Sequence, residues 1–159
     1  MIKTMSRREA AVLEGKSYAI RHENTALAKN AVLTISILTP ANGVVDVYGE
    51  YNCIGGSVKI EFLQGSTITA GSAYTPVNQN DNSTRASGCT VKTGVTVSED
   101  GTIKRTRTMF SAANVPSRSD SSVGDLIPRV LKPNTQYVLR ITALDGTTGV
   151  SAGLSITET

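Results

Sequence analysis

Apolar and polar residues alternate with a period of two through most of the chain after residue 16, and this pattern constrains the fold most. In VVDVYGEYNCI, one face carries Val45, Val47, Gly49, Tyr51 and Cys53. The same split recurs in CTVKTGVTV (89–97), QYVLRITA (136–143) and GVSAGLSIT (149–157). Successive side chains of a strand point to opposite faces, so the pattern predicts strands with one buried face.

Turn signals separate these runs. Asn42-Gly43, Gly55-Gly56, Asp100-Gly101 and Asp145-Gly146 each lie between two runs, where hairpin turns need positive φ. The runs predict about eight strands, at 17–24, 30–39, 44–54, 57–64, 86–97, 102–110, 135–144 and 148–157. LIPRVL at 126–131 predicts an extra edge strand, because Pro128 cannot donate to a central ladder. The expected fold is an all-β, antiparallel, jelly-roll-like sandwich.

A short arm precedes the strands. Ser6-Arg7-Arg8-Glu9 forms a capping box, and Gly15 is a natural stop, so a helix is expected over about 7–14. So short a helix is marginal alone in water and needs a surface to pack on. We therefore expect an N-terminal arm over 1–15 and one β-sandwich domain over 16–159.

The composition limits the core and the partners. The chain has no Trp and only two Phe and five Tyr, so its core is built from aliphatic residues. A thin aliphatic core favours stability shared with neighbours, which predicts a homo-oligomer or a large assembly. The formal charge of +3 is too small to predict a nucleic-acid partner, and no apolar stretch is long enough for a membrane span. Cys53 and Cys89 lie in apolar strand patterns, which favours two buried free thiols over a disulfide.

The amide-rich run NQNDNST (78–84) is the most unusual stretch. Asn78, Asn80 and Asn82 alternate as in a calcium loop, but the turn glycine and the closing Glu are missing, and only Asp81 is charged. We expect no metal there and interpret the run as a solvated crossover between sheets.

No catalytic motif stands out. His22 is the only histidine, and no G-x-S-x-G motif is present. Asp46, Glu50 and Glu61 would be neighbours if strands 44–54 and 57–64 formed a hairpin, but the solvent face is the simpler interpretation of these acids. We predict that the chain is not an enzyme and uses no cofactor.

The densest positive charge lies in IKRTRT (103–108). Alternation puts Arg105 and Arg107 on one face and Lys104 on the other. One interpretation is a solvated edge that resists strand-to-strand aggregation, and the other is an ionic contact with an acidic protein surface.

One local resemblance lies in LKPNTQYVLRITA. Leu131, Pro133, Thr135, Tyr137 and Leu139 resemble the tyrosine corner of fibronectin type III domains. That likeness implies that the Tyr137 hydroxyl bonds back to the preceding loop. It is confined to this segment, because the chain is much longer than one such domain and lacks the early-strand Trp.

A second resemblance covers nearly the whole chain. An N-terminal arm is followed by GKSYAI (15–20), VKIEFLQG (58–65), NQNDNS (78–83), a T-V-x-x-x-V-T-V strand (90–97), the SEDGT turn (98–102) and LKPNTQYVLRIT (131–142). In this order of features the chain resembles small jelly-roll decoration, or cement, proteins of tailed bacteriophages. The resemblance implies a structural virion protein, made in the host cytoplasm, that sits on the capsid as a dimer or trimer and clamps neighbouring major capsid subunits. It implies no catalytic residues.

The expected partner-binding residues are Arg7, Arg8, Val12, Leu13, Arg105, Arg107, Asn80 and Asn82. The arm is the main candidate for a clamp on the major capsid protein or a sister subunit. Three alternatives remain open from the sequence: a tail or baseplate sandwich, a module that binds a host-surface glycan and, last, a β-sandwich hydrolase.

Overall fold

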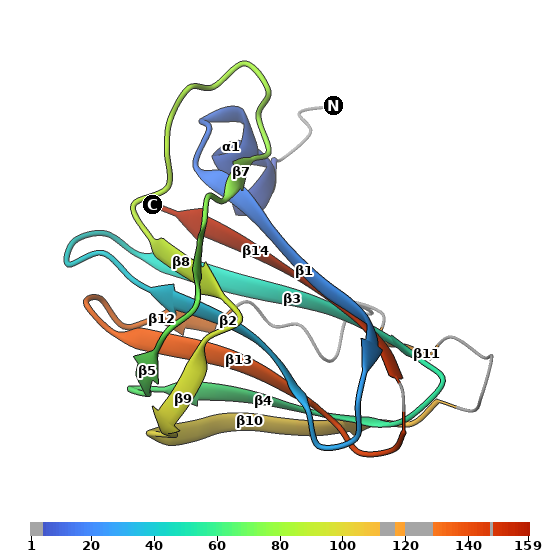
Figure 1. The fold of residues 1–159 in the computed structure, drawn as a ribbon. Helices are drawn as coiled ribbons and strands as arrows, with labels where there is room; N and C mark the ends of the chain where they lie inside the picture. Colours follow the sequence, from blue (N-terminus) through green and yellow to red (C-terminus); the bar gives the residue numbers. More distant parts are fainter. Residues whose placement is uncertain (1–4, 112–116, 120–128, 147) are drawn as a thin grey trace.

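Two antiparallel β-sheets pack face to face and form a sandwich in the computed structural model (Figure 1). The structure describes residues 5–111, 117–119, 129–146 and 148–159. Sheet A contains β7 (Val77–Asn78), β1 (Ser17–Leu27), β14 (Thr148–Glu158), β3 (Val45–Ile54) and two short strands that pair with β3, β11 (Ser117–Ser119) and β12 (Arg129–Leu131). Sheet B contains β10 (Thr102–Met109), β4 (Val58–Gln64), β13 (Gln136–Ala143), β2 (Val32–Leu38), β8 (Thr90–Thr93) and β6 (Ser72–Tyr74).

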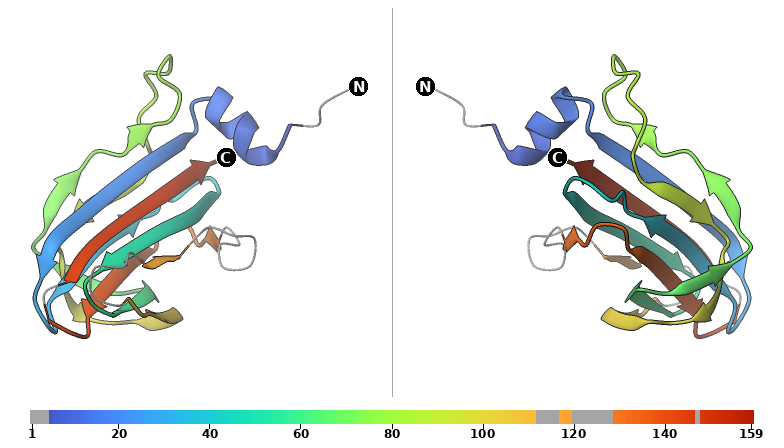
Figure 2. Two further views of the ribbon diagram at one scale, coloured as in Figure 1. Left: turned by 90° about the vertical axis from the view of Figure 1, so that its right-hand side faces the viewer. Right: turned by 90° about the vertical axis from the view of Figure 1, so that its left-hand side faces the viewer.

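The strands pair in a nested order. β1 pairs with β14, β2 with β13, β3 with β12, and β4 with β10, all antiparallel. The first strand of each pair comes from the first half of the sandwich sequence, and its partner comes from the second half in reverse order. β14 also pairs with β3, and β13 with β4, which completes the two sheets seen from the side in Figure 2. This nested pairing is the topology of a jelly roll, so the predicted fold class is confirmed.

The predicted turns are real, but the hairpins are not. Asn42-Gly43 leads from β2 in sheet B to β3 in sheet A, and Gly55-Gly56 leads back to β4 in sheet B. Asp145-Gly146 connects β13 to β14, again across the sandwich. Gly43 and Gly55 do adopt positive φ, at 92° and 82°. The hairpin interpretation was wrong because such glycines show where the chain reverses, not which strand it then pairs with.

The predicted strand over 86–97 is two strands. β8 ends at Thr93, Gly94 adopts a φ of 64°, and β9 (Thr96–Glu99) then pairs with β5 (Thr67–Thr69) in a separate two-stranded ribbon. Val91 lies in the main core, whereas Val95 packs with Leu63 and Val138 in a second cluster. Leu63 and Val138 alternate with core residues along β4 and β13, so the ribbon covers the outer face of sheet B.

The main core between the sheets is largely aliphatic. Its fully buried side chains include Ile20, Ile35, Ile37, Leu139, Ile141 and Ile156. Cys53 and Cys89 are both buried in it as free thiols. The rings of Phe62 and Tyr137, on the paired strands β4 and β13, stack within it, with centroids 5.5 Å apart.

The tyrosine-corner interpretation is confirmed. The Tyr137 hydroxyl accepts a hydrogen bond from the backbone N–H of Lys132, over 2.9 Å, and so ties the start of β13 to its loop. The predicted edge strand at 126–131 is confirmed for Arg129–Leu131, which pairs with β3 as β12, while 126–128 lie outside the described residues.

The predicted neighbourhood of three acids does not form. β3 and β4 belong to different sheets, so Asp46 and Glu50 lie on sheet A while Glu61 lies on sheet B. The solvent-face interpretation was wrong for Glu61, which is buried and bonded to Arg140 and Lys59. The alternation showed only that Glu61 faces away from the main core, and the β5–β9 ribbon covers part of that face.

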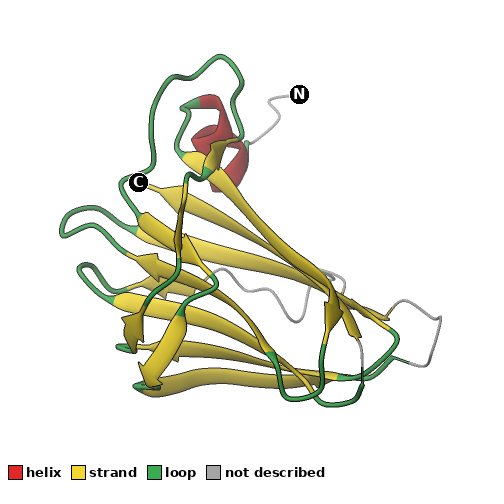
Figure 3. Ribbon diagram, in the orientation of Figure 1, coloured by secondary structure: helices red, strands yellow, loops and turns green. Residues whose placement is uncertain are grey.

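The described residues contain one helix, α1 (Arg7–Leu13), at the N-terminal end of the sandwich (Figure 3). Within the described ranges, no helix is long and apolar enough to cross a membrane.

Candidate partner-binding surface

Helix α1 forms through the predicted capping box. The Ser6 hydroxyl accepts from the Glu9 N–H at 3.2 Å, and the Glu9 carboxylate accepts from the Ser6 N–H at 2.8 Å. Hydrogen bonds from Ser6 lower the pKa of Glu9, first through its backbone and then through its side chain. After the last turn, Gly15 adopts a φ of 66°, the left-handed conformation that favours glycine. The predicted helix is therefore confirmed.

The amide-rich run holds the C-terminal end of α1. The side-chain amide of Asn80 donates to the Leu13 carbonyl at 2.9 Å, and that of Asn78 donates to the Gly15 carbonyl at 3.0 Å. The side-chain oxygens of Asn78 and Asn80 accept in turn from the N–H of Asn80 and Asn82. Because the last carbonyls of a helix have no partner within it, the Asn80 amide satisfies one that would otherwise need water. The Gly15 carbonyl, just beyond the helix, also accepts from the Tyr18 hydroxyl at 3.1 Å.

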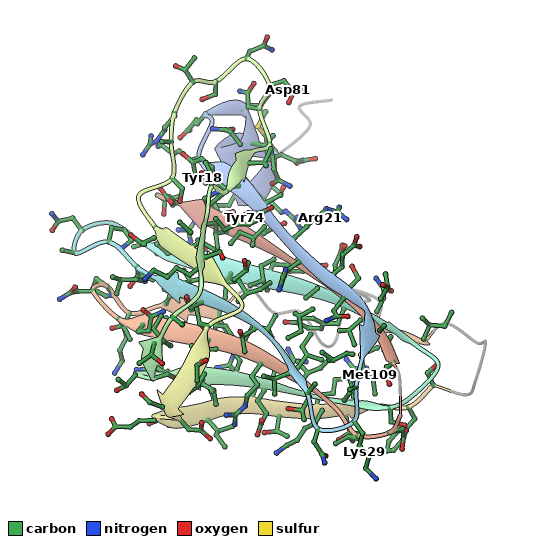
Figure 4. All side chains as sticks on the ribbon, viewed as in Figure 1. Tyr18, Arg21, Lys29, Tyr74, Asp81 and Met109 are labelled. Atoms are coloured by element: carbon green, nitrogen blue, oxygen red, sulfur yellow. The ribbon has the colours of Figure 1, made fainter. Side chains whose placement is uncertain are left out.

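The run is also the predicted crossover, since it leads from β7 in sheet A to β8 in sheet B. Its tip, marked by Asp81 in Figure 4, rises beside the helix. Asn80, expected to bind a partner, binds this chain's own helix, while the Asn82 side chain is exposed on the loop. Within the chain, then, Asn80 positions the arm.

The two arginines of α1 reach over the outer face of sheet A. The Arg8 guanidinium carbon lies 4.7 Å from the centroid of the Tyr48 ring, and Arg8 Nη2 is 3.4 Å from Ser155 Oγ. Arg7 Nη2 donates to Thr159 Oγ1 at 2.8 Å and lies 3.7 Å from Asp46 Oδ2. These contacts from β3 and β14 anchor the helix to the sandwich.

A hollow of about 380 Å³ opens between the helix and sheet A, and we call it the arginine hollow. Its lining includes Arg7, Arg8, Asp46, Tyr48, Val130 and Ser155. The Asp46 Oδ1 atom is buried and has no hydrogen-bond partner among the described residues. Alternation along 44–54 placed Asp46 and Tyr48 on one face, but nothing local to that strand showed that α1 folds over them.

The opposite side of α1 is apolar and faces away from the sandwich. Met5, just before the helix, and Leu13, at its end, are 53% and 65% exposed, and Val12 is half-buried. We call these three residues the arm stripe. Together with Glu9 they border a shallow hollow of about 450 Å³. Ala11 is buried against the body of the protein, so the helix has one packed face and one open apolar face.

Arg105 and Arg107 lie elsewhere and do not line the arginine hollow. They share a face of edge strand β10, as predicted, but they are half-buried and register with Phe62 and Ile60, two core residues of β4. Burial raises the pKa of the nearby Tyr51 hydroxyl to about 12, while the charges of these arginines oppose that rise. The predicted position at a sheet edge is confirmed, but both arginines are only partly exposed to solvent.

His22 lies on β1 opposite Ala152 of β14, a fully buried core residue. Partial burial lowers the pKa of the His22 imidazole, which favours its neutral form.

The predicted residues thus divide into two groups. Arg7, Arg8, Val12 and Leu13 come together on α1, which carries both guanidinium groups and apolar side chains. Arg105 and Arg107 lie apart from them on β10. No protein-family model matches the chain, and no curated protein matches it in sequence.

Proposed function

We propose that this chain is a structural virion protein that binds the outer surface of a bacteriophage capsid and stabilises neighbouring major capsid subunits as a homodimer or homotrimer. The observation that carries the proposal is the arm stripe: the large apolar side chains of Met5 and Leu13 stay exposed beside a half-buried Val12, on a short arm whose position is held by hydrogen bonds. Contiguous exposed apolar surface beside polar residues is typical of protein contact sites.

The way the helix is held supports this role. Capping by Ser6, the amides of Asn78 and Asn80, and the contacts of Arg7 and Arg8 all restrict the arm before a partner arrives. A helix that is already ordered loses less conformational entropy on binding than a free one does. Several such arms on one oligomer would bind a repetitive shell together, so weak single contacts would add up to tight attachment.

The jelly-roll topology and the order of sequence motifs are also consistent with a decoration protein. Under this proposal the partner is the major capsid protein, and the chain acts by burying surface rather than by catalysis.

The proposal is tested with empty shells assembled from the major capsid protein encoded in the same genome. The full chain should sediment with these shells through a density gradient. Burying a large apolar side chain contributes about 1.5–3 kcal/mol, so replacing both Val12 and Leu13 with Ser should weaken binding by about tenfold or more.

Val32→Ser is the matched control, because Val32 is also exposed but lies on β2, in the other sheet. Point changes are preferable to removal of the arm, since removal would also take away the carbonyl to which Asn80 donates. A full chain that leaves the shells bare would refute the proposed function. Equal binding by the Val12/Leu13 variant and the control would refute the role of the arm stripe.

A further inference from the structure

The arginine hollow and the arm stripe lie on two sides of the same arm, and we propose that the hollow is a socket for one acidic side chain of the partner protein, with Asp46 accepting a hydrogen bond from the backbone of the same segment. This inference deepens the proposed function, because it names the chemistry of the partner segment. It rests on the proposed function for one assumption, that the partner is a protein.

The first argument is the charge of the hollow. Two guanidinium groups line it against a single carboxylate, that of Asp46, so its net charge is positive. Arg7 and Arg8 each use only Nη2 in their hydrogen bonds to other described residues. The Arg7–Asp46 separation of 3.7 Å is longer than a hydrogen bond. The remaining N–H groups of both arginines are therefore available, and a carboxylate accepts such paired donors strongly.

The second argument is the Asp46 Oδ1 atom. It is buried but has no donor within the described residues, and an acceptor removed from water without a partner is unfavourable. A ligand that offered only a carboxylate would leave this oxygen unsatisfied. A peptide with Asp or Glu offers both groups that the hollow lacks: a carboxylate for the arginines and, once the Asp46 side chain rotates to turn Oδ1 toward the hollow, a backbone N–H for Asp46.

The third argument concerns size and surroundings. A volume of about 380 Å³ is within the usual range of ligand sites, which combine apolar walls with a few polar groups. Val47 contributes apolar wall, and Val130 is 67% exposed at the rim. Apolar surface around a charged socket fits a protein segment better than it fits an acidic sugar.

The test uses the isotope-labelled full chain and three probes followed by NMR: acetyl-Glu-Ala-amide, its uncharged isostere acetyl-Gln-Ala-amide, and glucuronic acid. The glutamate peptide should cause saturable shifts of the Tyr48, Ser155 and Arg8 signals and should bind at least about tenfold more tightly than the other two. Equal binding of the two peptides would overturn the socket, and preferential binding of glucuronic acid would overturn its assignment to a protein segment.

Variants separate the roles of the two groups. Arg8→Gln should abolish the shifts, whereas Arg21→Gln should not, because Arg21 is exposed on the outer face of β1 (Figure 4). Asp46→Ala removes a negative charge, so acetate should bind more tightly, while the glutamate peptide should bind more weakly because its N–H loses an acceptor. Tighter binding of both probes would overturn the role given to Asp46.

The shell assay distinguishes failure of the socket from failure of the proposed function. If the full chain binds shells and Arg8→Gln binds them equally well, the socket is wrong and the function stands. If the glutamate peptide binds as expected and the shells stay bare, the function is wrong and the socket stands. Loss of shell binding in Arg8→Gln alone, with Arg21→Gln unaffected, supports both.

Discussion

The side-chain amide nitrogen of Asn80 lies 2.9 Å from the carbonyl oxygen of Leu13, a residue 67 positions earlier in the chain. This hydrogen bond joins the tip of a loop between the two sheets to the last turn of α1. The orientation of the arm stripe therefore depends on a loop that is far from it in sequence. A partner that binds α1 therefore binds a surface that is held in place by the amide-rich run.

Replacing Asn80 with Ala should loosen α1 without unfolding the sandwich. The change removes the hydrogen bond to Leu13 and the one from the Asn82 N–H, each worth about 0.5–1.5 kcal/mol. Hydrogen exchange of the amides over 7–13 should become faster, while exchange in β13 stays the same. Asn82→Ala is the control, because that side chain is exposed. Equal effects of the two variants would contradict the capping role of Asn80.

The second apolar cluster should contribute to stability in its own right. Leu63 is fully buried between sheet B and the β5–β9 ribbon, so Leu63→Ala should lower the free energy of unfolding by about 2–5 kcal/mol. Ile103 pairs with Leu63 across β10 and β4 but is half exposed, so Ile103→Ala should change stability by no more than about 0.5 kcal/mol. Urea unfolding measures both. A small effect of Leu63→Ala would mean that the ribbon does not pack on the sheet.

Acid should destabilise the fold through the carboxylates around Arg140. Burial by itself raises the pKa of Glu61, but hydrogen bonds from Lys59 and Arg140 outweigh it, so the pKa is lowered from 4.5. A hydrogen bond from Arg140 lowers the pKa of Asp100 from 3.8. Both carboxyl groups bind protons more readily in the unfolded chain. Their contribution is therefore complete above about pH 4.5 and is lost as the pH falls through the lowered folded-state values.

Urea unfolding at about pH 7, 5 and 3 measures this loss. Asp100→Asn should be less stable near neutral pH and should lose less stability on acidification than the wild type. Glu50→Gln should keep the wild-type pH dependence, because Glu50 is exposed and belongs to the other sheet. The same pH profile for Asp100→Asn and the wild type would refute the role of this ion pair.

Both thiols should be unreactive in the folded protein. Burial, followed by the charge of Glu158, raises the pKa of the Cys89 thiol to about 12, and burial also raises that of Cys53. An aromatic disulfide reagent at about pH 8 should therefore label neither residue, because the thiolate is the reactive form. After unfolding in urea without a reductant, both thiols should react, and a Cys53→Ala variant should show only one. No reaction in the unfolded wild type would mean that the two cysteines pair.

Local features were predictable where local chemistry decides them. The helix begins after Ser6 and ends before Gly15, because capping and a left-handed glycine act over three or four residues. Most strand positions followed from alternation alone. The Tyr137–Lys132 hydrogen bond was also predictable, since it spans five residues.

The candidate site was predictable only in part. Sequence reasoning singled out Arg7, Arg8, Val12 and Leu13, but it could not tell which of them stay available to a partner. In the structure the arginines bind Thr159, Ser155 and Tyr48, from strands more than a hundred residues apart in sequence. Val95 shows the same limit: its apolar character predicted burial, but Gly94 and the ribbon decided that it is buried outside the main core.

By itself, the sequence determined the positions of the chain reversals, the extent of the helix and the inward face of most strands, because these depend on backbone conformation and side-chain polarity over a few residues. Only the tertiary structure decided which strand lies beside which, that the turns cross between sheets, and that α1 closes over Asp46. Hydrogen-bonding groups are the same along every strand, so the choice of partner comes from the combined packing of all the buried faces.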